Sequence, residues 1–259
     1  IHYPIHPRNR NWEPAFYFQD DWRATSWLTL NLGLRYEWYT PVTEADNQMS
    51  RFIPELGRIV VATDDDPRVG VKQDFSNIGP RVGFSATAPG QIVVRGGFGM
   101  TYTPGGAGAS SFLKNPPFTQ NFGPFTSGAT SGGAPTLFLR DAPPALVFAD
   151  ATRPAGQLAQ QITDYQVVRA KQFNLFAEKQ FGANVATIGY VGSRGDRLNQ
   201  NVNINQPPVG PGNVQTRRPY YAQYPLVTNI QMITPIGKRN YNAMQMLFQR
   251  RQSGGLNFA

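Results

Sequence analysis

Apolar and polar residues alternate at every second position in several stretches of this chain. The clearest stretch runs over residues 27–39. Its even positions carry aliphatic and aromatic residues, Leu28, Leu30, Leu32, Leu34, Tyr36 and Trp38, and the odd positions 29–37 are polar or glycine. Successive side chains of a β-strand point to opposite faces. The pattern therefore predicts a long strand with one apolar and one polar face.

The length of this strand favours a membrane barrel. Strands of soluble sheets usually have about five or six residues. At about 3.3 Å per residue and a tilt near 40°, this strand rises roughly 25–30 Å, which matches the apolar band of an outer-membrane barrel. Its aliphatic residues lie in the middle and its aromatic residues at the ends, as interfacial girdles require.

The same alternation recurs along the chain, at 15–23, 81–87, 92–102, 173–181, 184–192 and 241–251, and a further strand begins at 256–258. Short turns alternate with long connections of about 40–77, 103–170 and 194–240, within which local hairpins are expected at 58–62 and 227–234. Outer-membrane barrels combine short periplasmic turns with long extracellular loops. We predict an all-β fold: an antiparallel transmembrane β-barrel fragment of about eight strands, spanning residues 1–259.

Composition excludes several classes of protein. The chain has 24 Lys and Arg against 16 Asp and Glu, a net charge of +8, and no Cys. Without Cys there is no disulfide scaffold, thiolate zinc site, iron–sulfur cluster or cysteine nucleophile. Despite the positive charge, no basic helix or aromatic-basic stripe predicts nucleic-acid binding. No catalytic constellation and no cofactor motif occurs, so we expect no enzyme.

Both ends of the sequence indicate a fragment. It starts at Ile1, without a signal peptide, and ends at Ala259 in the opening of a strand. We therefore expect an internal piece of a longer protein.

Several segments together resemble a known family. Residues 18–23 (FQDDWR) followed by 28–37 (LTLNLGLRYE) resemble a barrel hairpin of TonB-dependent outer-membrane receptors, and more narrowly of their Oar-like branch. Supporting segments follow in order at 79–84 (GPRVGF), 94–99 (VRGGFG), 189–195 (GYVGSRG) and 240–245 (NYNAMQ). The ordered set spans most of the chain.

This resemblance implies a barrel of about 22 strands, closed by a separate N-terminal plug domain. It implies import of a scarce ligand through a gated lumen, powered by the TonB–ExbB–ExbD complex. The sequence shows no plug and no TonB-binding box, so energised transport is an expectation about the parent protein. The ligand is not indicated.

The polar parity of the predicted strands carries charged residues that we expect to face the lumen: Arg35, Glu37, Arg81, Arg95 and Glu178. They are candidates for a ligand path or for contact with a plug domain. The alternative is that they pair with one another across neighbouring strands. The apolar parity, from Leu28 to Trp38, is expected to face lipid.

Other motifs predict no metal or phosphate site. Three Asp residues at 64–66 lack the ligand spacing and fixed Gly of a calcium loop and are read as a solvated acidic loop. His2 and His6 are separated by Pro4, which opposes a helix, and no third ligand is evident. The glycine-rich segment 105–111 lacks the Lys of a phosphate loop.

Basic residues outside the polar parity suggest two further contacts. Arg217 and Arg218, in a predicted outer loop, are candidates for binding phosphates of lipopolysaccharide. The tripeptide Arg194-Gly195-Asp196 follows a predicted strand, where Gly and Asp are ordinary turn residues, so we favour a turn over an adhesion motif.

Two alternatives to the energised receptor are a passive porin or surface adhesin barrel, and a soluble all-β binding domain such as a propeller or sandwich. The continuous apolar face from Leu28 to Trp38 disfavours the soluble domain, which would bury that face against a partner layer.

Overall fold

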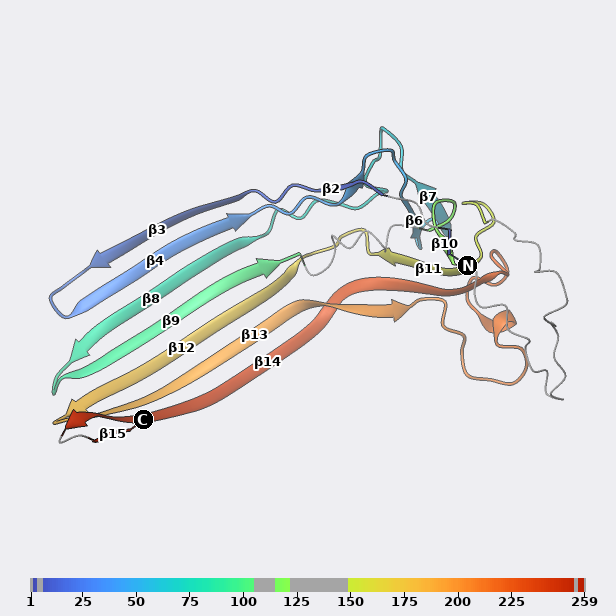
Figure 1. The fold of residues 1–259 in the computed structure, drawn as a ribbon. Helices are drawn as coiled ribbons and strands as arrows, with labels where there is room; N and C mark the ends of the chain where they lie inside the picture. The colour runs from blue at the N-terminus through green and yellow to red at the C-terminus, as the bar shows by residue number, and fades with distance from the viewer. Residues whose placement is uncertain (1, 4–6, 105–114, 122–148, 254–255, 259) are drawn as a thin grey trace.

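One curled sheet dominates the fold (Figure 1). The structure, a computed structural model, describes residues 2–3, 7–104, 115–121, 149–253 and 256–258. The sheet has nine strands in the order β11-β14-β13-β12-β9-β8-β4-β3, with β15 also paired to β14. Neighbouring strands are antiparallel except β11 and β14, which are parallel. Among the described residues, no helix is long and apolar enough to cross a membrane.

Each strand predicted from alternation is present. The bounds are β3 (Ala15–Arg23), β4 (Leu28–Glu37), β8 (Ile78–Ala88), β9 (Ile92–Thr103), β12 (Val168–Phe181), β13 (Asn184–Asn203), β14 (Val227–Ser253) and β15 (Leu256–Phe258). The sequence did not predict β11 (Gly156–Gln161). Short strands outside this sheet are β1 (His2–Tyr3), β2 (Asn9–Arg10), β5 (Thr43–Glu44), β6 (Ser50–Ile53), β7 (Arg58–Val61) and β10 (Gln120–Asn121), and a 3₁₀ turn covers Gln215–Arg217.

The strand register keeps the two parities on separate faces of the sheet. Leu30 lies opposite Trp22 on one side and Phe84 on the other. On the adjacent parity, Asn31 lies opposite Asp21 and Gly83. We call the face that carries Leu30 the apolar face and the face that carries Asn31 the polar face.

β13 and β14 extend furthest beyond the alternation that predicted them, and β8 and β12 also begin earlier than predicted, at Ile78 and Val168. β13 continues to Asn203 and β14 begins at Val227, so the connection expected over 194–240 covers only 204–226, and 227–234 is part of β14 rather than a separate hairpin. Alternation is lost there because the register shifts at 195–200, where Arg197 has a φ of 58°. β4 is shorter than its predicted stretch of 27–39, because it ends at Glu37, one residue before Trp38.

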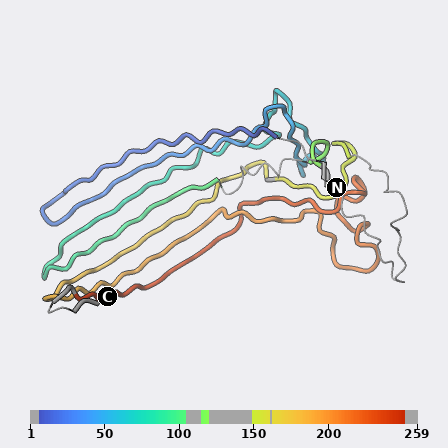
Figure 2. The backbone as a smooth tube through the Cα atoms, viewed as in Figure 1, coloured from blue at the N-terminus to red at the C-terminus, as the bar shows by residue number. Residues whose placement is uncertain are grey.

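The connections fall at opposite ends of the sheet. Short turns join β3 to β4, β8 to β9 and β12 to β13 at one end, and the long connections gather at the other (Figure 2). We call these the turn end and the loop end.

The long connections pack together at the loop end. We define the loop assembly as residues 38–77, 115–119, 149–167 and 204–233. The hairpin expected at 58–62 is present in a longer form, because Arg58–Val61 is only its second strand, β7, and pairs with β6. Residues from three connections share one buried cluster, Phe52, Ile59, Leu158, Tyr224, Val227 and Ile230. The loop assembly therefore has a hydrophobic core of its own.

Candidate functional site on the polar face

The predicted charged residues lie together on the polar face. Arg35 is opposite Gly79, and Arg81 lies between Gly33 and Gly99. Arg95 follows on the same parity through its pairing with Ser85. Directly opposite residues of an antiparallel pair share a face, so these side chains belong to one surface.

Two pairs among these residues form ion pairs. Arg35 Nε lies 2.9 Å from Glu37 Oε1, two positions along the same strand. Arg95 Nη2 lies 2.6 Å from Glu178 Oε2 on the neighbouring strand β12. The cross-strand pairing considered from sequence therefore describes Arg95 and Glu178, whereas Arg35 and Glu37 pair along a single strand.

Arg81 differs from the others. In the described part of the chain, no carboxylate lies within ion-pair distance of its guanidinium. Its cross-strand neighbours, Gly33 and Gly99, have no side chains to cover it. The Arg81 side chain is therefore exposed and unpaired on the polar face.

Arg81 borders a hollow of about 490 Å³ in this face. Four glycines on the neighbouring strands β4, β8 and β9 remove side chains from its floor: Gly33, Gly83, Gly97 and Gly99. Side-chain amides surround it: Gln19, Asn31, Gln172 and Asn174. The hollow thus combines one cation, several amide donors and acceptors, and bare backbone. These groups suit an anionic ligand that also bears hydroxyl or amide groups.

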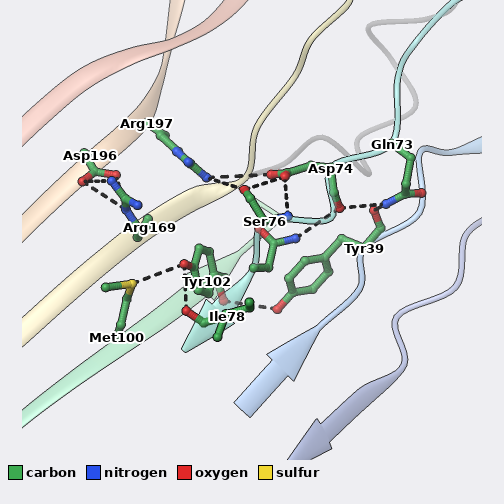
Figure 3. A network of polar contacts seen from close by, with 11 residues as sticks. Tyr39, Gln73, Asp74, Ser76, Ile78, Met100, Tyr102, Arg169, Asp196 and Arg197 are labelled. Atoms are coloured by element: carbon green, nitrogen blue, oxygen red, sulfur yellow. Dashed lines mark hydrogen bonds and ion pairs between the residues drawn. The ribbon is translucent and has the colours of Figure 1, made fainter. Parts of the chain in front are cut away.

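A network of hydrogen bonds and ion pairs connects strands and loops at the loop end of the sheet (Figure 3). Tyr39 donates its hydroxyl to the carbonyl of Tyr102, and Tyr102 donates to the carbonyl of Ile78. Burial, with a contribution from the Glu37 carboxylate, raises the pKa of Tyr39 to about 12, so its hydroxyl remains a donor. Arg197 reaches the loop before β8, where its Nη1 lies 3.8 Å from Asp74 Oδ2.

Buried polar groups connect the segments of the loop assembly. The Asn115 amide donates to the carbonyls of Ser50 and Ala159 and accepts from the Ala159 amide, so it bridges β6 and β11. Arg51, almost fully buried, donates to Thr163 Oγ1 at 2.9 Å. Burial lowers the pKa of Arg51 from its ordinary value.

Glu44 anchors the N-terminal side of the loop assembly. Burial would raise the pKa of Glu44, but the backbone amides of Gln48, Arg8 and Asp46 donate to its carboxylate and together lower that pKa. The ionised carboxylate is therefore the form that the fold stabilises.

The predicted acidic loop at 64–66 has structural roles. Asp64 accepts a hydrogen bond from Asn47, and Asp66 accepts one from the amide of Gly70. Among the residues that the structure describes, no group of three potential ligands could hold a metal ion. Residues 105–111 and His6 lie outside the described residues.

The segment 194–196 is not the turn that we expected. It lies inside β13, because that strand continues past the end of its alternation. The Asp196 carboxylate accepts three hydrogen bonds from Arg169. Arg217 and Arg218 bond within their own connection, to the carbonyls of Pro208 and Asn205.

The apolar face carries large side chains that no other part of the described chain covers. Leu34, Leu175 and Met244 are half or more exposed. The predicted residues Leu28, Leu30, Leu32, Leu34 and Tyr36 lie on this face by register, opposite Ala86, Phe84, Val82, Pro80 and Ile78. Trp38, past the strand end, contacts the ring of Phe75.

Sequence reasoning missed the hollow and the bridging amide of Asn115. Glycines at 33, 83, 97 and 99 are visible in the sequence, but only the register brings them together. A local signal for the loop assembly was present at 50–61, where apolar residues lie on each side of a Pro- and Gly-containing turn.

Comparison with known proteins supports the membrane assignment. The family model described as outer membrane beta barrel domain matches residues 2–259. No curated protein matches the chain. The family and the fold place the protein in the bacterial outer membrane.

Several solved structures are similar to the chain at low identity. The siderophore receptor PirA from Pseudomonas aeruginosa is 11% identical with a TM-score of 0.41 over 92% of this chain. The outer membrane transporter YddB from Escherichia coli is 12% identical with a TM-score of 0.49 over 92%. The Serratia marcescens hemophore receptor HasR, solved as a double mutant with its hemophore HasA and heme, is 11% identical with a TM-score of 0.47 over 93%. The chain spans 31%, 21% and 32% of these three proteins, respectively.

Proposed function

Since the chain belongs to the outer membrane beta barrel domain family, we propose that it forms part of the barrel wall of a TonB-dependent receptor of the Oar-like branch. In this proposal the loop assembly binds a ligand, which then passes along the polar face through a gated lumen. The partners are outer-membrane lipid, a plug domain of the parent protein and the TonB–ExbB–ExbD complex. The two-faced sheet with the hollow at Arg81 is the observation that carries the proposal.

The division of the sheet assigns the two sides of the barrel wall. Apolar side chains such as Leu34, Leu175 and Met244 are costly to expose to water and suit contact with lipid chains. The polar face carries the ion pairs and amides, which suit a hydrated lumen. We therefore assign the apolar face to lipid, the polar face to the lumen and the loop end to the cell exterior.

Arg81 is the proposed ligand contact on the lumen wall. An unpaired guanidinium attracts carboxylates and phosphates through charge-assisted hydrogen bonds. The surrounding amides of Asn31 and Asn174 bind hydroxyl and amide groups, and the glycines let a ligand approach the backbone. The proposed ligand class is an anionic, hydroxyl- or amide-bearing molecule that slides past this hollow.

Cysteine labelling tests the barrel assignment, because the chain has no Cys of its own. Gln172→Cys on the polar face and Leu175→Cys on the apolar face are compared in cells with a small, water-soluble maleimide. We expect labelling of Gln172→Cys only, and an increase in its rate when the TonB complex is energised. Equal labelling with and without TonB function would indicate a passive pore. Labelling of Leu175→Cys alone would overturn the assignment of the faces.

Charged thiol reagents test the role of Arg81. In the Gln172→Cys protein, an anionic methanethiosulfonate should react several-fold faster than a cationic one of similar size, because the nearby guanidinium concentrates anions. Arg81→Gln should remove this preference. Arg95→Gln, which alters a paired arginine on the same face, should leave most of it intact. Retention of the preference in Arg81→Gln would show that Arg81 does not attract the anion.

A further inference from the structure

Basic residues occur on the apolar face, where lipid contact should exclude them. Lys171 on β12 and Arg194 on β13 lie directly opposite each other in the register. Lys171 also pairs with Met100, which belongs to the apolar parity of β9. Both residues lie near the loop end of the face, directly beyond the pair of Phe173 and Gly192, and Tyr190 follows on the turn-end side of Gly192.

The surroundings of Arg194 hold its guanidinium in place against an aromatic floor. Its carbon Cζ lies 5.4 Å from the centroid of the Phe173 ring, and this ring contacts Tyr190 at 6.1 Å between centroids. Gly192 makes room for the floor, because a Cβ there would collide with the Phe173 ring. Arg194 also donates to Asn242 Oδ1 at 2.8 Å, and the Tyr190 hydroxyl donates to the same oxygen.

The charges of this cluster are not balanced. Arg169, Lys171 and Arg194 contribute three positive charges. Among the described residues, Asp196 is the one carboxylate in an ion pair with them, at 2.8 Å from Arg169 and 3.5 Å from Lys171. Within the described residues, no carboxylate lies within ion-pair distance of Arg194. Excess positive charge at the edge of an apolar surface requires an anionic partner or water.

We propose that Lys171 and Arg194, with the aromatic floor of Phe173 and Tyr190, bind the phosphate groups of a lipopolysaccharide molecule in the outer leaflet. The acyl chains of that lipid would lie along the apolar face below, beside Leu175 and Met244. Charge complementarity supports this occupant, because phosphates of the outer leaflet lie at the boundary where an apolar band ends. The lipid would then be a specific partner of strands β12 and β13.

This inference rests on the proposed assignment of the apolar face to lipid. The two can fail separately. If Leu175→Cys reacts with a water-soluble maleimide in cells, the assignment fails and the lipid site with it. If Leu175→Cys is protected, the lipid site is tested by its own variants.

The test measures lipopolysaccharide binding to the full-length parent protein in detergent, by native mass spectrometry. The double variant Lys171→Gln/Arg194→Gln should bind about tenfold or more weakly, because each charge-assisted bond is worth more than a neutral one. Lys179→Gln is the matched control, since Lys179 lies on the same strand and parity near the turn end. Its binding should equal that of the wild type.

Two further measurements make the outcome decisive. Dephosphorylated lipopolysaccharide should bind the wild type as weakly as intact lipopolysaccharide binds the double variant. If the double variant does not fold into a heat-modifiable barrel, Arg194→Lys is measured in its place. Because Arg194→Lys keeps the charge, it should retain part of the binding. Equal binding of intact and dephosphorylated lipid to the wild type would overturn the proposal, and so would wild-type binding by a folded double variant.

Discussion

The sheet and the loop assembly accommodate their apolar residues in opposite ways. On the sheet, Met244 and Leu175 are 66% and 51% exposed, whereas Phe52 and Leu158 in the loop assembly are fully buried. The sheet depends on an apolar surrounding that the described part of the chain does not supply. The loop assembly has its own core and its own buried hydrogen bonds. Membrane insertion should therefore control the stability of the sheet, and internal packing that of the loop assembly.

Removal of the Phe52 ring from the core of the loop assembly should show most clearly that the loop assembly and the sheet differ in what stabilises them. Phe52→Ala empties the space between Tyr220 and Tyr224, whose rings pack edge-on against Phe52. We expect a loss of about 3–5 kcal/mol in the local stability of the loop assembly. Hydrogen exchange should accelerate over residues 50–61 and 156–163, with little change in β4 and β8.

The control for this substitution is Leu56→Ala in the same hairpin, where the side chain is 55% exposed. It should change exchange little. An equal acceleration in the sheet strands would mean that the two regions unfold as one unit.

A glycine substitution tests the sheet in the same comparison. Phe176 packs over Gly189 on the polar face, and a Cβ at Gly189 would collide with that ring. Gly189→Ala should cost the folded barrel about 1–3 kcal/mol in urea unfolding from vesicles, since the ring must move. Gly97→Ala is the control, because a Cβ there would meet its nearest neighbours, atoms of Asn174 and Val82, at an ordinary contact distance of 3.7 Å. Similar losses in both variants would show that ring packing is not the cause.

Asn115→Ala tests whether hydrogen bonds as well as packing stabilise the loop assembly. It leaves buried groups of Ser50 and Ala159 without partners, which should cost about 1–3 kcal/mol locally. Limited proteolysis should then cut near residues 50–61 and 156–163. Asn47→Ala, which removes an exposed bond to Asp64, should not increase cleavage. Resistance of the Asn115 variant would contradict the bridging role.

The smallest expected effect concerns pH. The pKa of Glu44 is lowered in the fold, so its ionised form stabilises the loop assembly above the ordinary pKa of about 4.3, and this stabilisation is lost as pH falls through the lowered pKa. Hydrogen exchange near residues 43–48 should accelerate below that range. In Glu44→Gln this acid dependence should diminish. An unchanged acid profile in the variant would assign the effect to another group.

The sequence predicted the sheet far better than the loop assembly. Alternation such as that of Leu28 to Tyr36 is a local consequence of one face meeting an apolar medium, so it can be read without knowing any partner strand. The end of β13 was missed because the register shifts near Arg197. Beyond that point the strand contacts the loop assembly, and no longer an apolar medium. The alternation therefore stops before the strand does.

The candidate site could be predicted only in part. The parity rule placed Arg35, Arg81 and Arg95 on one face, and the register confirms that they share it. It could not distinguish paired from unpaired charges, because Glu178 meets Arg95 across 83 residues of sequence. The unpaired state of Arg81 depends on glycines from other strands, which a single sequence does not align.

The parallel strand β11 limits how far the sheet can grow at the edge formed by β14. It occupies the side of β14 from Val227 to Ile233, and β15 meets the same side at Arg250. Between these two points, that edge has no strand partner among the described residues. A neighbouring strand extending upward from the turn end would have to leave the sheet near Ile233. β11, which lies in the connection between β9 and β12, thus sets the height of the barrel rim at this position. It also shields the loop-end part of β14 from unintended pairing with other chains.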